Sequence, residues 1–240
     1  MNHLSAIMPG DPFLRFIAVA CCLVFTGCGS GDSDDTTSID SPKDADAGGA
    51  NSIWIEAESA SLVASPWTVE TSAEGYSGTG YLFNGSDVEL ARSGGETIYE
   101  FEIEEPGEYM AIIRGRRDNE GHCENQAYDK CNDVRSAWNG GTFEKTMVKG
   151  PWGCWIWETR IELVKDGNHS FKRNTAMLQP GKNTFHIGVR SSGVKLDAIL
   201  IHRVGDPLPT GKYTEPACSE TISLAEAVEL RGRPLPAPPE

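Results

Sequence analysis

The chain has little positive charge. Its 240 residues include 21 Lys and Arg against 35 Asp and Glu, which gives a formal net charge of −14. Such a balance leaves little to neutralise phosphates, so a general nucleic-acid binder is excluded. The chain also lacks an apolar run of the roughly 18 residues that a membrane-spanning helix needs. At 39% hydrophobic residues it is nevertheless long enough to bury a core of ordinary size.

Motifs that carry catalysis are absent as well. No Gly-x-Ser-x-Gly nucleophile elbow is present, and no glycine-rich phosphate loop opens a helix. Four histidines, His122, His169, His186 and His202, are scattered along the chain and have no nucleophile motif beside them. We therefore expect a protein that is not an enzyme.

The longest apolar run lies within residues 1–27 and has the length and position of a signal-peptide hydrophobic region. It ends in Thr-Gly before Cys28, and small residues before a Cys resemble the bacterial lipoprotein box, in which that Cys receives lipid. Phe25 stands where the box usually has Leu, so Cys21 and Cys22 stay open as acceptors, as does an ordinary cleaved signal. We expect lipidation of Cys28 and an exported protein anchored to a bacterial membrane by that lipid, at the cell surface or the periplasmic face.

The remaining four cysteines are Cys123, Cys131, Cys154 and Cys218. An even number in an oxidising compartment predicts two disulfides, with three possible connectivities. We favour Cys123–Cys131, which closes a short loop, and Cys154–Cys218, which would attach the C-terminal tail to the domain. A metal site with the neighbouring His122 is the alternative, but neither CxxC nor HxxxH spacing occurs.

Composition divides the mature chain into three parts. Residues 28–52 are small, polar and acidic, which predicts a flexible tether. Residues 53–203 read as short strands separated by turns, as at 97–103, where polar and apolar residues alternate. Residues 204–240 form a tail that ends in a Pro-rich, disordered stretch, and helical composition is confined to 223–231. Many short strands without intervening helices predict an all-β protein, a β-sandwich.

Four of the six tryptophans lie within twenty residues, at Trp138, Trp152, Trp155 and Trp157. Trp155 and Trp157 are two residues apart, so they share one face of a strand. They can belong to the core or present flat rings to a sugar. Trp152 lies in a Gly-Pro-Trp-Gly turn, where a large ring is expected to be partly exposed, which makes it the better ligand candidate.

Three carboxylates form another candidate site. Glu56 and Glu58 alternate along the first strand and would point to one face. If the last strand lies beside the first, Asp197 joins them, and the mutual repulsion of the three charges would be relieved by calcium, which accepts six to eight oxygen ligands. An exposed acidic strand end is the alternative.

A series of short segments, in this order and spacing, resembles carbohydrate-binding modules of families 6 and 35 over residues 53–203. The segments are Ile55-Glu56-Ala57-Glu58, Gly78-Thr79-Gly80-Tyr81-Leu82, Pro106-Gly107-Glu108-Tyr109 with Arg114, Asn132-Asp133-Val134, Trp155-Ile156-Trp157, Gln179-Pro180-Gly181-Lys182-Asn183 and Val194-Lys195-Leu196-Asp197-Ala198-Ile199. The resemblance implies a non-catalytic β-jelly-roll that binds sugars on a loop-lined face and holds a structural calcium. A related domain also ends some xylan-directed glycoside hydrolases.

The resemblance also suggests residues. Glu56, Glu58 and Asp197 match the calcium ligands, and Trp152 or Trp155 matches the stacking aromatic. Lys195 departs from the Asn that many sugar-binding members have two residues before the final-strand Asp. An ammonium there either blocks the usual cleft or favours an acidic sugar.

From these features we predict polysaccharide binding near the cell surface. Trp152, Trp155 and Tyr81 are the expected stacking residues, and Asn132, Asp133 and Lys195 the expected polar contacts. One alternative is an envelope lipoprotein that uses the sandwich for structure or for protein contacts, and a polysaccharide hydrolase is the less favoured one.

Overall fold

The computed structural model describes residues 52–86, 95–127, 130–211, 213, 218 and 223–229. All of them belong to the second of two compact units, Pro42–Glu240. The expected signal peptide, Cys28 and the expected tether up to residue 51 lie outside the described residues. Within the described part, no helix is long and apolar enough to cross a membrane.

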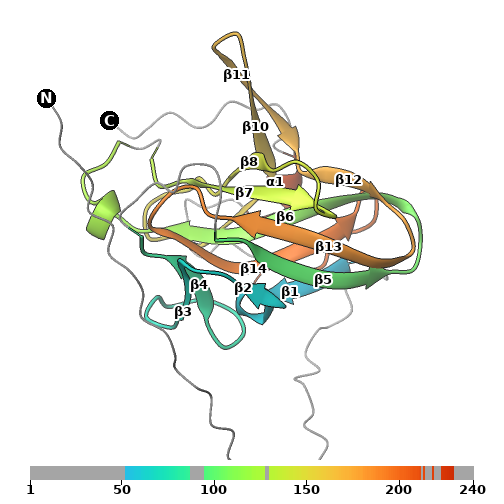
Figure 1. The fold of residues 1–240 in the computed structure, drawn as a ribbon, viewed down its shortest axis with the longest axis horizontal. Helices are drawn as coiled ribbons and strands as arrows, with labels where there is room; N and C mark the ends of the chain where they lie inside the picture. The colour runs from blue at the N-terminus through green and yellow to red at the C-terminus, as the bar shows by residue number, and fades with distance from the viewer. Residues whose placement is uncertain are drawn as a thin grey trace, which may run out of the picture. The chain divides into compact units, whose positions relative to one another are not determined.

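The described strands form two antiparallel sheets that pack face to face as a β-sandwich (Figure 1). The first sheet has the order β12-β6-β14-β4-β3, with β1 also paired to β14 and β9 to β6. Its strands are β1 (Ser52–Glu56), β3 (Trp67–Glu70), β4 (Tyr81–Asn84), β6 (Gly107–Arg117), β9 (Ile156–Glu158), β12 (Thr175–Leu178) and β14 (Val194–Arg203). The first and last strands of the domain are therefore neighbours, as expected: Glu56 pairs with Ala198.

The second sheet has the order β11-β10-β8-β7-β13-β5-β2. Its strands are β2 (Leu62–Val63), β5 (Thr97–Ile103), β7 (Asp133–Trp138), β8 (Glu144–Met147), β10 (Arg160–Lys165), β11 (Asn168–Arg173) and β13 (Gly181–Gly188). In Figure 1 the β10–β11 hairpin projects away from the sandwich. Two 3₁₀ turns, η1 (Ala57–Ser59) and η2 (Gly121–Cys123), and one helix, α1 (Leu224–Glu229), complete the described elements.

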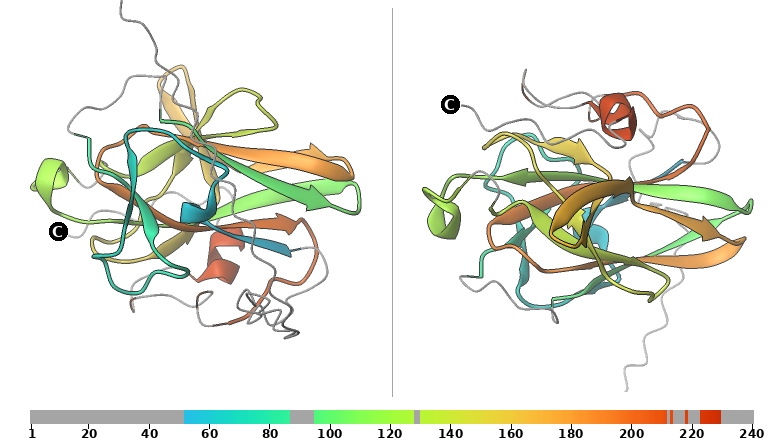
Figure 2. Two further views of the ribbon diagram at one scale, coloured as in Figure 1. Left: turned by 60° about the horizontal axis from the view of Figure 1, so that its bottom comes forward. Right: turned by 90° about the horizontal axis from the view of Figure 1, so that it is seen from above.

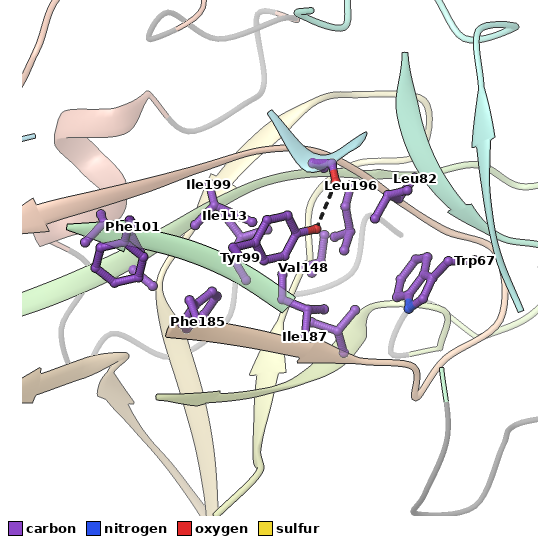
Figure 3. Packing of buried hydrophobic residues seen from close by; sticks show 14 of the residues in the cluster. Trp67, Leu82, Tyr99, Phe101, Ile113, Val148, Phe185, Ile187, Leu196 and Ile199 are labelled. Carbon is purple, nitrogen blue, oxygen red and sulfur yellow. Dashed lines mark hydrogen bonds between the residues drawn. The ribbon is translucent and has the colours of Figure 1, made fainter. Parts of the chain in front are cut away.

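The predicted fold class is confirmed, and β5 shows why. Its residues 97, 99, 101 and 103 are buried while Glu100 and Glu102 are exposed, as period-two alternation requires. Tyr99 and Phe101 lie between the sheets with Phe185, Ile187 and residues of the first sheet (Figure 3). The Tyr99 hydroxyl donates to the Ala57 carbonyl at 3.1 Å, so this polar atom is satisfied inside the core.

The outer face of the first sheet, which points away from the second sheet, is covered near α1. Figure 2 shows α1 lying over this sheet. Leu224 and Ala227 of α1 pack against Met110, Ile112 and Trp157. The Trp157 indole N–H donates to the backbone oxygen of Tyr213 at 2.9 Å. Part of the predicted tail is therefore a structural cover, and β6 is buried on both faces for this reason.

Both predicted disulfides are confirmed. Cys123 is bonded to Cys131, with Cα atoms 6.1 Å apart, and Cys154 is bonded to Cys218, with Cα atoms 6.0 Å apart. The alternative of a metal site on these cysteines is wrong, because all four sulfurs are in disulfides. The second bridge joins the turn before β9 to the C-terminal segment.

Candidate functional site

The three predicted carboxylates converge on one loop, Ser77–Gly80, beside the outer face of the first sheet. The Ser77 hydroxyl donates to Glu56 at 2.6 Å, and the Ser77 backbone N–H donates to Asp197 at 2.7 Å. The backbone N–H groups of Thr79 and Gly80 donate to Glu58 at 2.6 and 3.1 Å. We call Glu56, Glu58 and Asp197 the carboxylate cluster.

The reason predicted for this convergence is only partly right. β1 ends at Glu56, and Glu58 lies in η1, so the two do not alternate along one strand. Instead they approach the loop at Gly78, where φ is +62° and a Cβ atom would lie 2.4 Å from Oε1 of Glu58. Asp197 reaches the loop from a β-bulge in β14, where the register to β6 shifts between Leu196 and Ala198.

Burial and the like charges of neighbouring carboxylates both disfavour ionisation in this cluster. Burial raises the pKa of Glu56, and the charges of Asp197 and Glu58 add to the rise. Burial also raises the pKa of Asp197, although the Arg114 guanidinium forms an ion pair with it and opposes the rise. The cluster therefore favours a neutralising partner, and Arg114 supplies one positive charge for three carboxylates.

The fit to a metal ion is partial. Oε2 of Glu58 is buried and has no hydrogen-bond partner, as expected for an open ligand position. The other carboxylate oxygens accept hydrogen bonds from Trp54, Ser77, Thr79, Gly80 and Arg114. Over the described residues, no group of three or more His, Cys, Asp or Glu side chains has the arrangement of a metal site. The charge thus suits a hard cation, while the coordination shell is incomplete.

Trp152 lies at the end of β6 and is half-buried. The guanidinium carbon of Arg117 lies 4.1 Å from the centroid of its ring, within cation–π distance. Arg117 is itself buried, and it donates to the backbone oxygens of Gly150 at 2.8 Å and Lys130 at 2.9 Å. The indole is therefore held on a fixed support, as expected for a ring that presents its free surface to a ligand.

An ion-pair network adjoins the turn that carries Trp152. The Lys195 ammonium contacts Asp118 and, at 2.7 Å, Glu120. Nε of Arg116 donates to the other oxygen of Asp118 at 2.8 Å. A Cβ atom at Gly153, the residue after Trp152, would lie 3.8 Å from Asp118 and 4.0 Å from Arg116, so the turn and the network adjoin. We call Trp152, Arg116, Asp118, Glu120 and Lys195 the Trp152 site.

Two of the predicted stacking residues are buried, and we do not retain them as ligand residues. Tyr81 is fully covered: its hydroxyl is 2.9 Å from that of Ser72, and its ring meets Trp155 edge-on at 5.5 Å. Trp155 is 2% exposed, and its indole N–H donates to the Glu74 carbonyl at 2.8 Å. The physical reason is that the segment preceding β4 lies over both rings.

The predicted polar residues Asn132 and Asp133 are also buried, and Asp133 begins β7 in the second sheet. Its carboxylate accepts from Ser191 at 2.6 Å and pairs with Arg190 and Lys145. The Asn132 carbonyl accepts from the Val148 backbone at 2.7 Å. Every contact recorded for these two residues is internal, and none joins them to the Trp152 site.

Sequence reasoning missed Asp118 and Glu120. The sequence offered one signal. Lys195 lies at the start of a mainly apolar strand, and an ammonium that becomes buried there requires counter-charges. Their position in the sequence, however, did not reveal that the segment after β6 returns to β14. Of the predicted ligand residues, Trp152 and Lys195 lie in adjoining parts of the surface, whereas Tyr81 and Trp155 meet each other in the interior.

The described residues thus form a β-sandwich that has Trp152 and an ion-pair network in adjoining parts of its surface. No protein-family model and no curated protein sequence matches this chain. Solved structures of similar fold include a GH26 β-(1,4)-mannanase of Podospora anserina that carries a family 35 carbohydrate-binding module. It aligns at 16% identity and a TM-score of 0.44 over 69% of this chain, which spans only 30% of that enzyme.

Two isolated modules are similar as well. A family 35 carbohydrate-binding module from Clostridium thermocellum aligns at 19% identity and a TM-score of 0.41, over 63% of this chain and 98% of the module. The C-terminal family 6 module of a marine laminarinase from Zobellia galactanivorans aligns at 18% identity and a TM-score of 0.40, over 64% of this chain and all of the module. Carbohydrate-binding modules of families 35 and 6 are thus among the solved structures similar to this chain.

Proposed function

We propose that this chain binds carbohydrate, without turning it over, at the Trp152 site. The observation that carries the proposal is the half-buried Trp152, whose ring lies on buried Arg117 and whose turn adjoins the charged network of Lys195. A pyranose ring has an apolar C–H face and a rim of hydroxyls. An aromatic ring beside fixed hydrogen-bond donors and acceptors matches both. The resemblance of the sequence to carbohydrate-binding modules supports the same conclusion.

Binding of the purified chain to a panel of plant and algal polysaccharides tests this proposal. We expect Trp152→Ala to weaken the affinity for the retained glycan by about tenfold or more, which corresponds to ~1.4 kcal/mol. Phe143→Ala is the matched control, because Phe143 is an exposed aromatic residue that follows β7 of the second sheet. An affinity that stays within twofold after Trp152→Ala would refute the stacking role. Release of reducing sugar, abolished by a single Asp or Glu substitution, would favour a hydrolase instead.

We further propose that the carboxylate cluster binds one calcium ion with a structural role. Glu56, Glu58 and Asp197 would hold it, and the ion would supply positive charge between β1, the Ser77–Gly80 loop and β14. The buried, unpartnered oxygen of Glu58 supports the proposal. We expect calcium to raise the unfolding temperature relative to chelator, and Glu58→Gln to reduce that rise. An unfolding temperature that is the same with millimolar calcium and with chelator would overturn it.

We also propose export and lipid attachment at Cys28. The support is the apolar run that ends at this cysteine, together with two disulfides, which persist in oxidising compartments. Metabolic labelling with a fatty-acid analogue should mark the wild-type protein and not Cys28→Ala. If Cys28→Ala still incorporates the label, Cys21 or Cys22 becomes the acceptor to test.

A further inference from the structure

Lys195 is less available than the sequence suggests. The sequence left two interpretations, an ammonium that blocks the cleft or one that attracts an acidic sugar. In the structure the Lys195 side chain is only 5% exposed and its ammonium has two carboxylate partners, Asp118 and Glu120. With Arg116 on Asp118, the network contains two cations and two anions, so its net charge is zero.

The positive and negative groups of the network also lie at different depths below the surface. The lysine is buried beneath the site, whereas the side chain of Glu120 is 68% exposed. A ligand that extends from Trp152 over the adjoining network therefore meets the exposed Glu120 carboxylate before the buried Lys195 ammonium, whose charge is already paired. Glu74 is exposed as well, and its carbonyl accepts from Arg116 of the network at 3.5 Å, while the whole chain is strongly acidic.

From this we infer that the Trp152 site takes neutral saccharides and that Glu120 is the residue that discriminates against anionic ones. The inference deepens the proposed carbohydrate binding and rests on it. Hydroxyl groups of a neutral sugar can donate to Asp118 and Glu120 and accept from Arg116, so a neutral ligand satisfies the network. The carboxylate of a uronic acid would instead face Glu120, and like charges repel.

The test compares two single-charge changes in the same segment. Glu120→Gln removes the exposed charge that contacts Lys195 and keeps the size of the side chain. Glu124→Gln is the matched control, because Glu124 is exposed and follows η2 only four residues later. Dissociation constants are measured at low and high salt for neutral galactan against polygalacturonate, and for arabinoxylan against glucuronoxylan.

We expect the wild-type chain to bind the neutral member of a pair about tenfold more tightly or better. Glu120→Gln should narrow this ratio roughly threefold or more at low salt, and Glu124→Gln by less than about twofold. High salt should reduce the difference, since exposed charges are screened.

Equal or tighter binding of the anionic glycan by the wild-type chain would overturn the inference and leave carbohydrate binding intact. An equal effect of the two substitutions would remove the role of Glu120. If the folded wild-type chain retains no glycan of either kind, the proposed function itself fails, and the inference fails with it.

Discussion

Removal of the Cys154–Cys218 disulfide tests whether the C-terminal segment is part of the domain. The bridge joins residues 64 positions apart, whereas Cys123–Cys131 spans 8. Two separate variants each lack one bridge: one has Ala at positions 154 and 218, and the other has Ala at positions 123 and 131. Ala is preferred to Ser, because a hydroxyl at buried Cys123 would need a hydrogen-bond partner.

The expected loss of stability follows from the conformational entropy of the unfolded chain. A disulfide that closes a longer loop lowers this entropy more. The loop relation gives about 4 kcal/mol for the 64-residue separation and about 2.5 kcal/mol for the 8-residue separation. For a protein of this size the two variants should differ by roughly 4–7 °C in unfolding temperature. Loss of the longer bridge also releases the C-terminal segment that covers Trp157, which adds to the loss of stability in this variant.

Urea and thermal unfolding, followed by tryptophan fluorescence, measure both effects. We expect the variant without Cys154–Cys218 to be the less stable and to show red-shifted emission before global unfolding, as Trp157 meets water. The variant without Cys123–Cys131 should keep its native emission. Equal stability of the two variants, or greater loss for the short loop, would refute the reasoning.

Three further predictions concern buried residues. Glu158→Gln should cost about 3–5 kcal/mol in the free energy of unfolding, measured with urea, because it leaves the Arg160 charge buried without its counter-ion. Ile199→Ala, in the core between the sheets, should cost about 2–5 kcal/mol in the same assay. Burial lowers the pKa of His202, although its hydrogen bond to the Asp206 carbonyl and the Asp206 charge oppose this. The wild-type chain should therefore lose stability as the pH falls below about 6.5, where the unfolded chain takes up the proton first. Thermal scans of His202→Gln from pH 7.5 to 5 should lack that loss, and an identical pH dependence in both proteins would contradict the assignment.

Local patterns in the sequence were sufficient to predict the fold class. The alternation at 97–103 predicted β5 with the correct faces, because the period of a strand is a property of the local backbone. The cysteine pairs were favoured among three connectivities because one closes a short loop and the other attaches the tail. The turn predicted the partial exposure of Trp152, because turns lie at the surface.

The tertiary structure alone decided which charges meet. Whether Tyr81 and Trp155 are exposed depends on the segment that covers them, and this segment is distant in sequence from Trp155. The counter-charges of Lys195 come from residues 75 or more positions earlier, brought close by the pairing of β6 with β14. Periodicity and spacing are local, whereas burial and ion pairing are set by strands that become neighbours only on folding. The sequence by itself thus predicted the sandwich and the partial exposure of Trp152, and the packing of distant segments determined which charges lie near the turn that carries this residue.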